Sequence, residues 1–161
     1  MKMLFRVLPV FLVTALLAGL YAHAQSDGWL TGSTDRDEQI ALIEDYIGGY
    51  SGTMMEVGYR FESTHQAIQD DNHELAAYHW DKLGGAMEWG SIKRPARAEN
   101  AELLFLGAPW ENLDEALRDN DSERVVDLFN VARGACMACH EAEGVGFMND
   151  QPLLRNTEIA P

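Results

Sequence analysis

The chain contains two cysteines, Cys136 and Cys139, and the residue that follows the second one is His140. Cysteine sulfurs at this spacing reach the two vinyl groups on one edge of a haem and form thioether bonds with them. The adjacent histidine then reaches the iron through its imidazole ring. The C-x-x-C-H run over residues 136–140 therefore predicts one covalently attached haem c, with His140 as the proximal iron ligand.

Other uses of these residue types fit the sequence less well. A structural zinc site needs four ligands, and no second Cys/His pair is placed to complete one. A redox-active dithiol of the thioredoxin type needs its C-x-x-C beside a strand–helix unit, and no strand pattern is longer than a few residues. The sequence contains no Ser/His/Asp set, paired carboxylates or phosphate loop. We therefore expect the protein not to be an enzyme, because the chemistry belongs to the haem.

The first 24 residues have the organisation of a secretory signal peptide. Lys2 and Arg6 give a positive start, an apolar stretch covers residues 7–22, and Ala22 and Ala24 are the small residues that a signal peptidase reads. The alternative is an uncleaved membrane anchor, but the apolar stretch is short of the roughly 20 residues that span a bilayer. We expect cleavage before Gln25, a periplasmic protein without a membrane span after cleavage, and a single domain over residues 25–161.

The remaining chain is strongly acidic. The full sequence has a formal net charge of −14, and removal of two basic residues with the signal brings it to about −16. Nucleic-acid binding needs basic patches that contact phosphates, so this charge excludes nucleic acid as a partner. It favours solubility and a redox partner protein with a basic docking surface.

Apolar residues at steps of three and four predict four helical stretches, which must position the haem motif. The first runs from Asp37 to Ile68, with a kink or break allowed at its glycines. The second covers residues 73–89, is capped by Asn72, and is followed by a loop over residues 90–95. The third starts near residue 96 and is interrupted at residues 107–109, with further turns over 111–119.

The fourth stretch opens at Asp121 or Ser122 and stops before Gly144. The tail over residues 147–161 has no periodic signal and is expected to be irregular. Short links between amphipathic helices are typical of bundles. The sequence therefore predicts an all-α fold, a four-helix up-down-up-down bundle with the haem near the C-terminal end of the last helix.

The position of the C-x-x-C-H motif late in the chain resembles that in one class of c-type cytochromes. Small class I cytochromes c have the motif early and a methionine ligand far downstream, but only 21 residues follow His140. Over residues 37–146 the chain resembles the class II c-type cytochromes of the cytochrome c′ type, most closely in VARGACMACHEA, residues 131–142. Residues 72–78, NHELAAY, also resemble a NWELAAYEL pattern of small exported haem proteins, with histidine in place of the tryptophan. The family has low-spin members with a first-helix methionine on the iron and high-spin members with an apolar residue there.

Met54 is our candidate for the sixth iron ligand. In an up-down-up-down bundle the C-terminal end of the fourth helix lies beside the N-terminal half of the first. Met54 is on the apolar stripe of that half, whereas Met55 is turned away by about 100°. The alternative is that Met54 simply fills the core. His65 is three turns further along and is expected at the wrong level. Less suitable methionines are Met87, Met137 and Met148.

One basic cluster stands out in this acidic sequence. Lys93, Arg94 and Arg97 lie around the link between the second and third helical stretches, which the same topology places at the haem end. Because a guanidinium donates two hydrogen bonds to a carboxylate, we expect one of these residues to bind a haem propionate. The alternative is an ordinary solvated loop.

These observations favour one-electron transfer by a six-coordinate haem with His140 and Met54 as ligands. A high-spin, gas-binding haem protein with an open iron face, as in the high-spin cytochromes c′, is the alternative. A small haem subunit of a larger redox complex is a third hypothesis. Class II relatives often dimerise through their first two helices, so the resemblance leaves a homodimer open for this chain.

Overall fold

A computed structural model describes Gly32 and residues 34–160, and the described residues form helices and turns without any strand. The signal-peptide prediction, residues 1–24, lies outside the described residues. The chain divides into two compact units at Ile47 and Gly48. The first contains helix α2 (Arg36–Ile47), and the second contains the other described helices and all candidate site residues. Among the described helices, none combines the length and the apolar character needed to cross a membrane.

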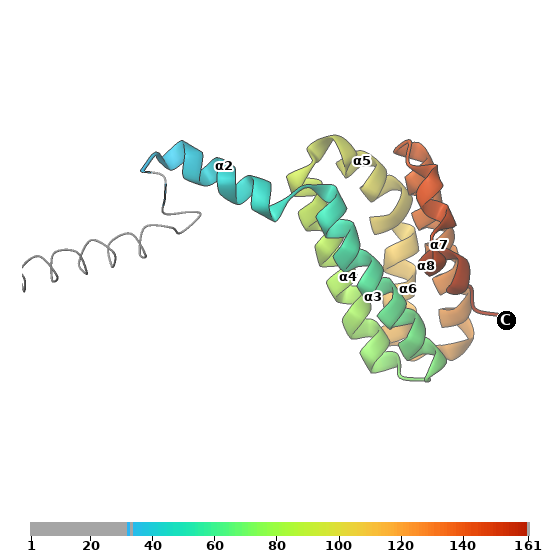
Figure 1. Ribbon diagram of the computed structural model, residues 1–161. Helices are drawn as coiled ribbons and strands as arrows, with labels where there is room; N and C mark the ends of the chain where they lie inside the picture. Colours follow the sequence, from blue (N-terminus) through green and yellow to red (C-terminus); the bar gives the residue numbers. More distant parts are fainter. Residues whose placement is uncertain (1–31, 33, 161) are drawn as a thin grey trace, which may run out of the picture. The chain divides into compact units, whose positions relative to one another are not determined.

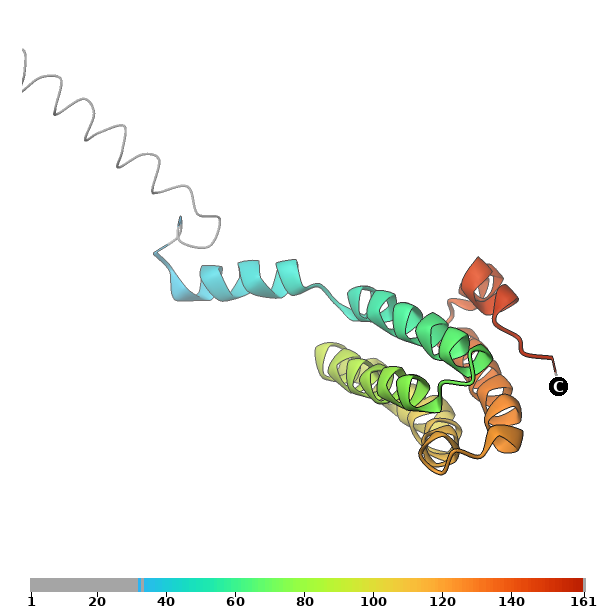
Figure 2. The same ribbon diagram turned by 90° about the horizontal axis from the view of Figure 1, so that it is seen from below.

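Four long helices build the second unit: α3 (Tyr50–Gln69), α4 (His73–Lys93), α6 (Ala108–Arg118) and α7 (Ser122–Ala142). Helix α3 packs along α4, α4 packs against α6, and α6 packs against α7, while α3 also contacts α7 (Figures 1 and 2). The all-helical class is therefore confirmed, and the packing is compatible with a helical bundle.

The expected single helix across residues 37–68 is divided. Gly48 has a φ of +70°, a left-handed conformation that glycine adopts without a steric penalty, and it ends α2 before α3 starts at Tyr50. The second expected helix is longer than predicted, because α4 continues through Gly90 to Lys93. It stops where Pro95 forces the preceding Arg94 out of the helical region. The expected loop from residue 90 is therefore wrong.

Three short segments replace the expected third helix. They are the 3₁₀ turn η1 (Pro95–Arg97), helix α5 (Ala98–Ala101) and the π-helical turn η2 (Glu102–Leu106). The predicted interruption is confirmed at Gly107, where α6 begins with Pro109 in its first turn. The π turn carries Phe105, whose ring is fully buried.

The predicted helix ends are confirmed at three positions. The Asn72 carboxamide oxygen accepts a hydrogen bond from the Leu75 N–H at 3.0 Å and caps α4. The Asp121 carboxylate accepts from the Arg124 N–H at 3.2 Å and caps α7. Gly144, with a φ of +70°, follows the end of α7.

The tail is ordered, which corrects the prediction of an irregular segment after residue 146. It forms the 3₁₀ turn η3 (Gly146–Asp150) and the short helix α8 (Pro152–Asn156). Asn130 on α7 holds it by two hydrogen bonds, donating to the Ile159 carbonyl at 2.8 Å and accepting from the Ile159 N–H at 3.0 Å. Leu154 is buried against the core. Single buried residues of this kind leave no periodic pattern in a sequence.

Aromatic side chains join the helices at the centre of the bundle. Phe61 on α3 stacks on Phe129 of α7 at 4.7 Å between ring centroids, and Trp80 on α4 meets Phe105 edge-on at 5.7 Å. The indole of Trp80 donates to the Trp110 carbonyl at 2.9 Å, and the Trp110 indole donates to the Trp80 carbonyl at 3.2 Å. This reciprocal tryptophan pair satisfies both indole donors and ties α4 to α6.

Candidate functional site

A cavity of about 570 Å³ lies between α3 and the C-terminal half of α7. Its volume is within the range of small-molecule and cofactor sites, and its walls are mainly apolar. Cys136, Cys139 and His140 all line it, so the complete C-x-x-C-H motif borders one space. Phe61 and Phe105 contribute aromatic wall from α3 and η2.

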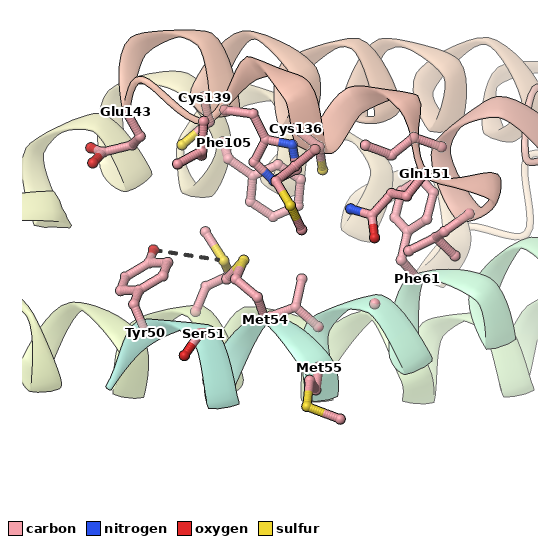
Figure 3. A pocket seen from close by; sticks show the side chains of 18 of the residues that line it. Tyr50, Ser51, Met54, Met55, Phe61, Phe105, Cys136, Cys139, Glu143 and Gln151 are labelled. Atoms are coloured by element: carbon pink, nitrogen blue, oxygen red, sulfur yellow. Dashed lines mark hydrogen bonds between the residues drawn. The ribbon is translucent and has the colours of Figure 1, made fainter. Parts of the chain in front are cut away.

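Met54 lines the same cavity from α3. Figure 3 shows Met54 and Tyr50 pointing from α3 toward Cys136 and Cys139 on the opposite helix. Met55 also borders the cavity, but its side chain points away from the cysteines and is 79% exposed. The structure thus brings together the motif and the methionine that the helical pattern selected, and it separates the two adjacent methionines as their 100° offset requires.

Two further methionines share the cavity, which the sequence pattern did not indicate. Met87 lines it from α4, and the Tyr50 hydroxyl contacts the Met87 sulfur at 3.9 Å as a hydrogen-bond donor. Met148 lines it from η3 and is 37% exposed. Met137, between the cysteines, is not part of the lining. His65 is also absent from the lining and packs on Phe129.

The two cysteines are unpaired thiols. Burial raises the pKa of the Cys136 thiol to about 12. Burial, followed by the negative charge of Glu143, raises the pKa of the Cys139 thiol. Both groups are therefore neutral at physiological pH, unlike the activated thiolates of dithiol oxidoreductases.

His140 has a defined hydrogen-bond partner outside the cavity. Its Nδ1 lies 2.8 Å from the carboxamide oxygen of Asn149 on η3. The Asn149 carboxamide nitrogen donates to the Met137 carbonyl and to a Glu141 carboxylate oxygen, each at 3.1 Å. Sequence reasoning missed Asn149 because it lies in the tail that showed no periodicity.

The basic cluster divides between the cavity and its surroundings. Arg97 lines the cavity and forms an ion pair with Glu143 at 2.8 Å, and Asn100 donates to the same carboxylate at 2.8 Å. The Arg94 guanidinium donates to the Lys93 carbonyl at 2.9 Å and lies beside Gly49, outside the cavity lining. The Lys93 ammonium contacts the Thr53 hydroxyl at 3.5 Å. Of the three candidates, Arg97 alone borders the cavity, and a propionate contact of any of them stays a prediction.

The donor set determines what the site could hold. Among Gly32 and residues 34–160, no group of three or more His, Cys, Asp or Glu side chains could hold a metal ion by itself. Two adjacent sulfurs, one imidazole and an opposing thioether around an apolar space instead fit a haem that brings its own four nitrogen ligands. No family model, curated protein or solved structure matches this chain.

Proposed function

We propose that this protein is an exported monohaem c-type cytochrome of the class II kind that carries one electron at a time. The observation that carries the proposal is that Cys136, Cys139, His140 and Met54 all line one mainly apolar cavity. An up-down-up-down bundle would bring the motif at the end of α7 beside Met54 in the first half of α3, and this expectation supports the proposal. The acidic surface suits a redox partner with a basic docking face in the periplasm.

Each of these side chains has a distinct role. Cys136 and Cys139 would anchor the group through thioethers, and His140 would provide a nitrogen ligand to the iron through its Nε2. Met54 would provide a soft sulfur ligand, and the buried rings of Phe61 and Phe105 form part of the apolar wall. When bound, haem supplies the one-electron couple of its iron, and a methionine ligand raises the potential of that couple.

Acid–acetone extraction after expression with a cytochrome c maturation system tests covalent attachment. The colour should remain with the polypeptide in the wild-type protein, because thioethers survive the extraction. It should be absent from the Cys136→Ala/Cys139→Ala variant, and Met55→Ala should behave as wild type. Wild-type protein that yields its colour to the solvent, or that acquires none, would refute the proposal.

The absorption spectrum separates electron transfer from the gas-binding alternative. Sharp low-spin bands with a weak red sulfur-to-iron band would support a His/Met-ligated electron carrier. A broad high-spin spectrum would replace that function with gas binding at an open iron face.

A further inference from the structure

We infer that Asn149 is a positioning residue that fixes the tautomer of His140 and sets how strongly its Nε2 donates electrons to the iron. The inference rests on the proposed function. It concerns a residue of the tail that lies outside the C-x-x-C-H motif and nine positions after the histidine.

The hydrogen bonds of Asn149 decide the orientation of its own carboxamide. Two acceptors, the Met137 carbonyl and a Glu141 carboxylate oxygen, face one end of this group at 3.1 Å each. An acceptor can be satisfied only by a donor, so the NH₂ end must point to them. The oxygen end then faces His140 Nδ1 at 2.8 Å.

This orientation also decides the protonation of the imidazole. Because the Asn149 oxygen can only accept, Nδ1 of His140 must carry the proton. In a neutral imidazole the other nitrogen, Nε2, then has a free lone pair. The fold therefore prepares His140 in the tautomer that ligates iron through Nε2, a bracing that metal-ligating histidines usually receive.

The backbone after α7 is built to bring Asn149 to this place. Gly144 turns the chain in a left-handed conformation, and the Val145 N–H donates to the His140 carbonyl at 2.9 Å. The Met148 N–H then donates to the Val145 carbonyl at 2.8 Å. A Cβ added at Gly146 would collide with the Glu141 carboxylate, so the turn closes tightly over the carboxylate that Asn149 binds.

The strength of this hydrogen bond should appear in the reduction potential. A good acceptor at Nδ1 makes the imidazole more basic, and a more basic ligand stabilises the oxidised iron. Asn149→Ala should therefore raise the potential. A carboxylate at position 149 should lower it. This is tested as Glu141→Gln/Asn149→Asp, with Glu141→Gln as reference. The Glu141 carboxylate would repel the new carboxylate, whereas a glutamine amide there can donate to the oxygen that replaces the Asn149 nitrogen beside the Met137 carbonyl.

The iron–histidine stretching band provides a second readout, measured in ferrous protein that also carries Met54→Ala so that no sixth ligand interferes. The frequency of this band should fall in Asn149→Ala and rise in Glu141→Gln/Asn149→Asp relative to Glu141→Gln. Asn130→Ala is the matched control, since it removes the other carboxamide that tethers the tail but does not touch His140. It should leave both readouts at their wild-type values.

Three results would overturn the inference: an unchanged potential and band in Asn149→Ala, shifts of the same sign for alanine and aspartate, or an equal shift in Asn130→Ala. The last two would indicate a merely loosened tail. If Asn149→Ala fails to fold, the aspartate pair still decides the question. A wild-type protein that attaches no haem would instead show that the proposed function is wrong.

Discussion

Met54 and Met55 are adjacent in α3 but face different surroundings. Met54 points toward the cysteines of α7, whereas Met55 points away from them and is largely exposed. One substitution therefore tests the proposed ligand and the neighbouring one serves as its control.

Met54→Ala should convert the iron from low spin to high spin and leave the haem attached. Axial ligands move haem potentials over about 0.8 V, so loss of the sulfur should lower the potential by on the order of 0.1 V. Absorption spectra and a redox titration measure both effects, and Met55→Ala should change neither. A Met54→Ala protein that keeps its sulfur-to-iron band would point to Met87 or Met148, which line the same cavity.

Arg97 is the arginine that borders the cavity, and its partner there is Glu143. A cation beside a haem propionate stabilises the reduced, more negative state, so Arg97→Gln should lower the reduction potential by about 0.03–0.06 V, corresponding to roughly 1 kcal/mol for a partly exposed charge contact. Arg94→Gln should leave it unchanged, because Arg94 lies outside the cavity lining. Redox titration of the two variants makes the comparison. Equal shifts would show that overall charge, rather than contact, is responsible.

At the scale of the helices, Gly84 and Gly85 of α4 form a natural test pair. A Cβ on Gly84 would lie 2.8 Å from the Trp110 indole, which the reciprocal tryptophan pair holds in place. A Cβ on Gly85 would meet nothing within 4 Å. The two positions differ in contact with α6 and share the same helical backbone.

Gly84→Ala should lower the free energy of unfolding by about 1–3 kcal/mol, the usual cost of overpacking. Gly85→Ala should raise it by about 0.5–1 kcal/mol, because alanine loses less backbone entropy in a helix. Urea denaturation followed by circular dichroism measures both. If Gly84→Ala were as stable as Gly85→Ala, the tryptophan pair would not be the rigid contact described here.

Local signals explain which helices and which site residues were predictable. Asn72, Asp121 and Gly144 mark helix ends through their own hydrogen bonds and backbone angles, so these boundaries are visible in the sequence. The selection of Met54 over Met55 needed only helical periodicity. The structure places Met54 on the cavity wall, and its ligation of iron stays a prediction.

Features that depend on tertiary contact were not predictable. The extension of α4 through Gly90 brings that glycine against Tyr50 and Thr53 of α3, where an added Cβ would lie 3.1 and 3.0 Å away. The tail is held by side-chain hydrogen bonds to α7, two of them made by Asn130, and Asn149 reaches His140 through a turn rather than a repeat. Such contacts join residues without any periodic spacing, so no sequence pattern reports them.

At the scale of the whole molecule, the net charge should govern how fast the protein meets charged redox reagents. With a formal charge of −14 over the full sequence, the protein should attract small cationic redox reagents and repel anionic ones. Raising the ionic strength from about 0.01 M to about 1 M shortens the Debye length from about 30 Å to about 3 Å.

The rate of reaction with a cationic oxidant should therefore fall by about tenfold over that range, and the rate with an anionic oxidant should rise. Stopped-flow measurements of haem oxidation provide the test. Identical salt responses for the two reagents would show that electrons leave through a surface without net negative potential.

The reciprocal tryptophan pair has an optical consequence. Phe61 and Phe105 both line the cavity, and their rings lie 6.5 and 5.7 Å from that of Trp80. Only the ring of Phe61 or Phe105 would separate a haem in this cavity from Trp80. The haem would absorb at the wavelengths where indole emits. The fluorescence of Trp80 should be quenched in the folded haem protein and should increase on unfolding. The tryptophan pair that ties α4 to α6 would then be an intrinsic fluorescent probe of folding, with weak emission in the folded haem protein and strong emission after unfolding.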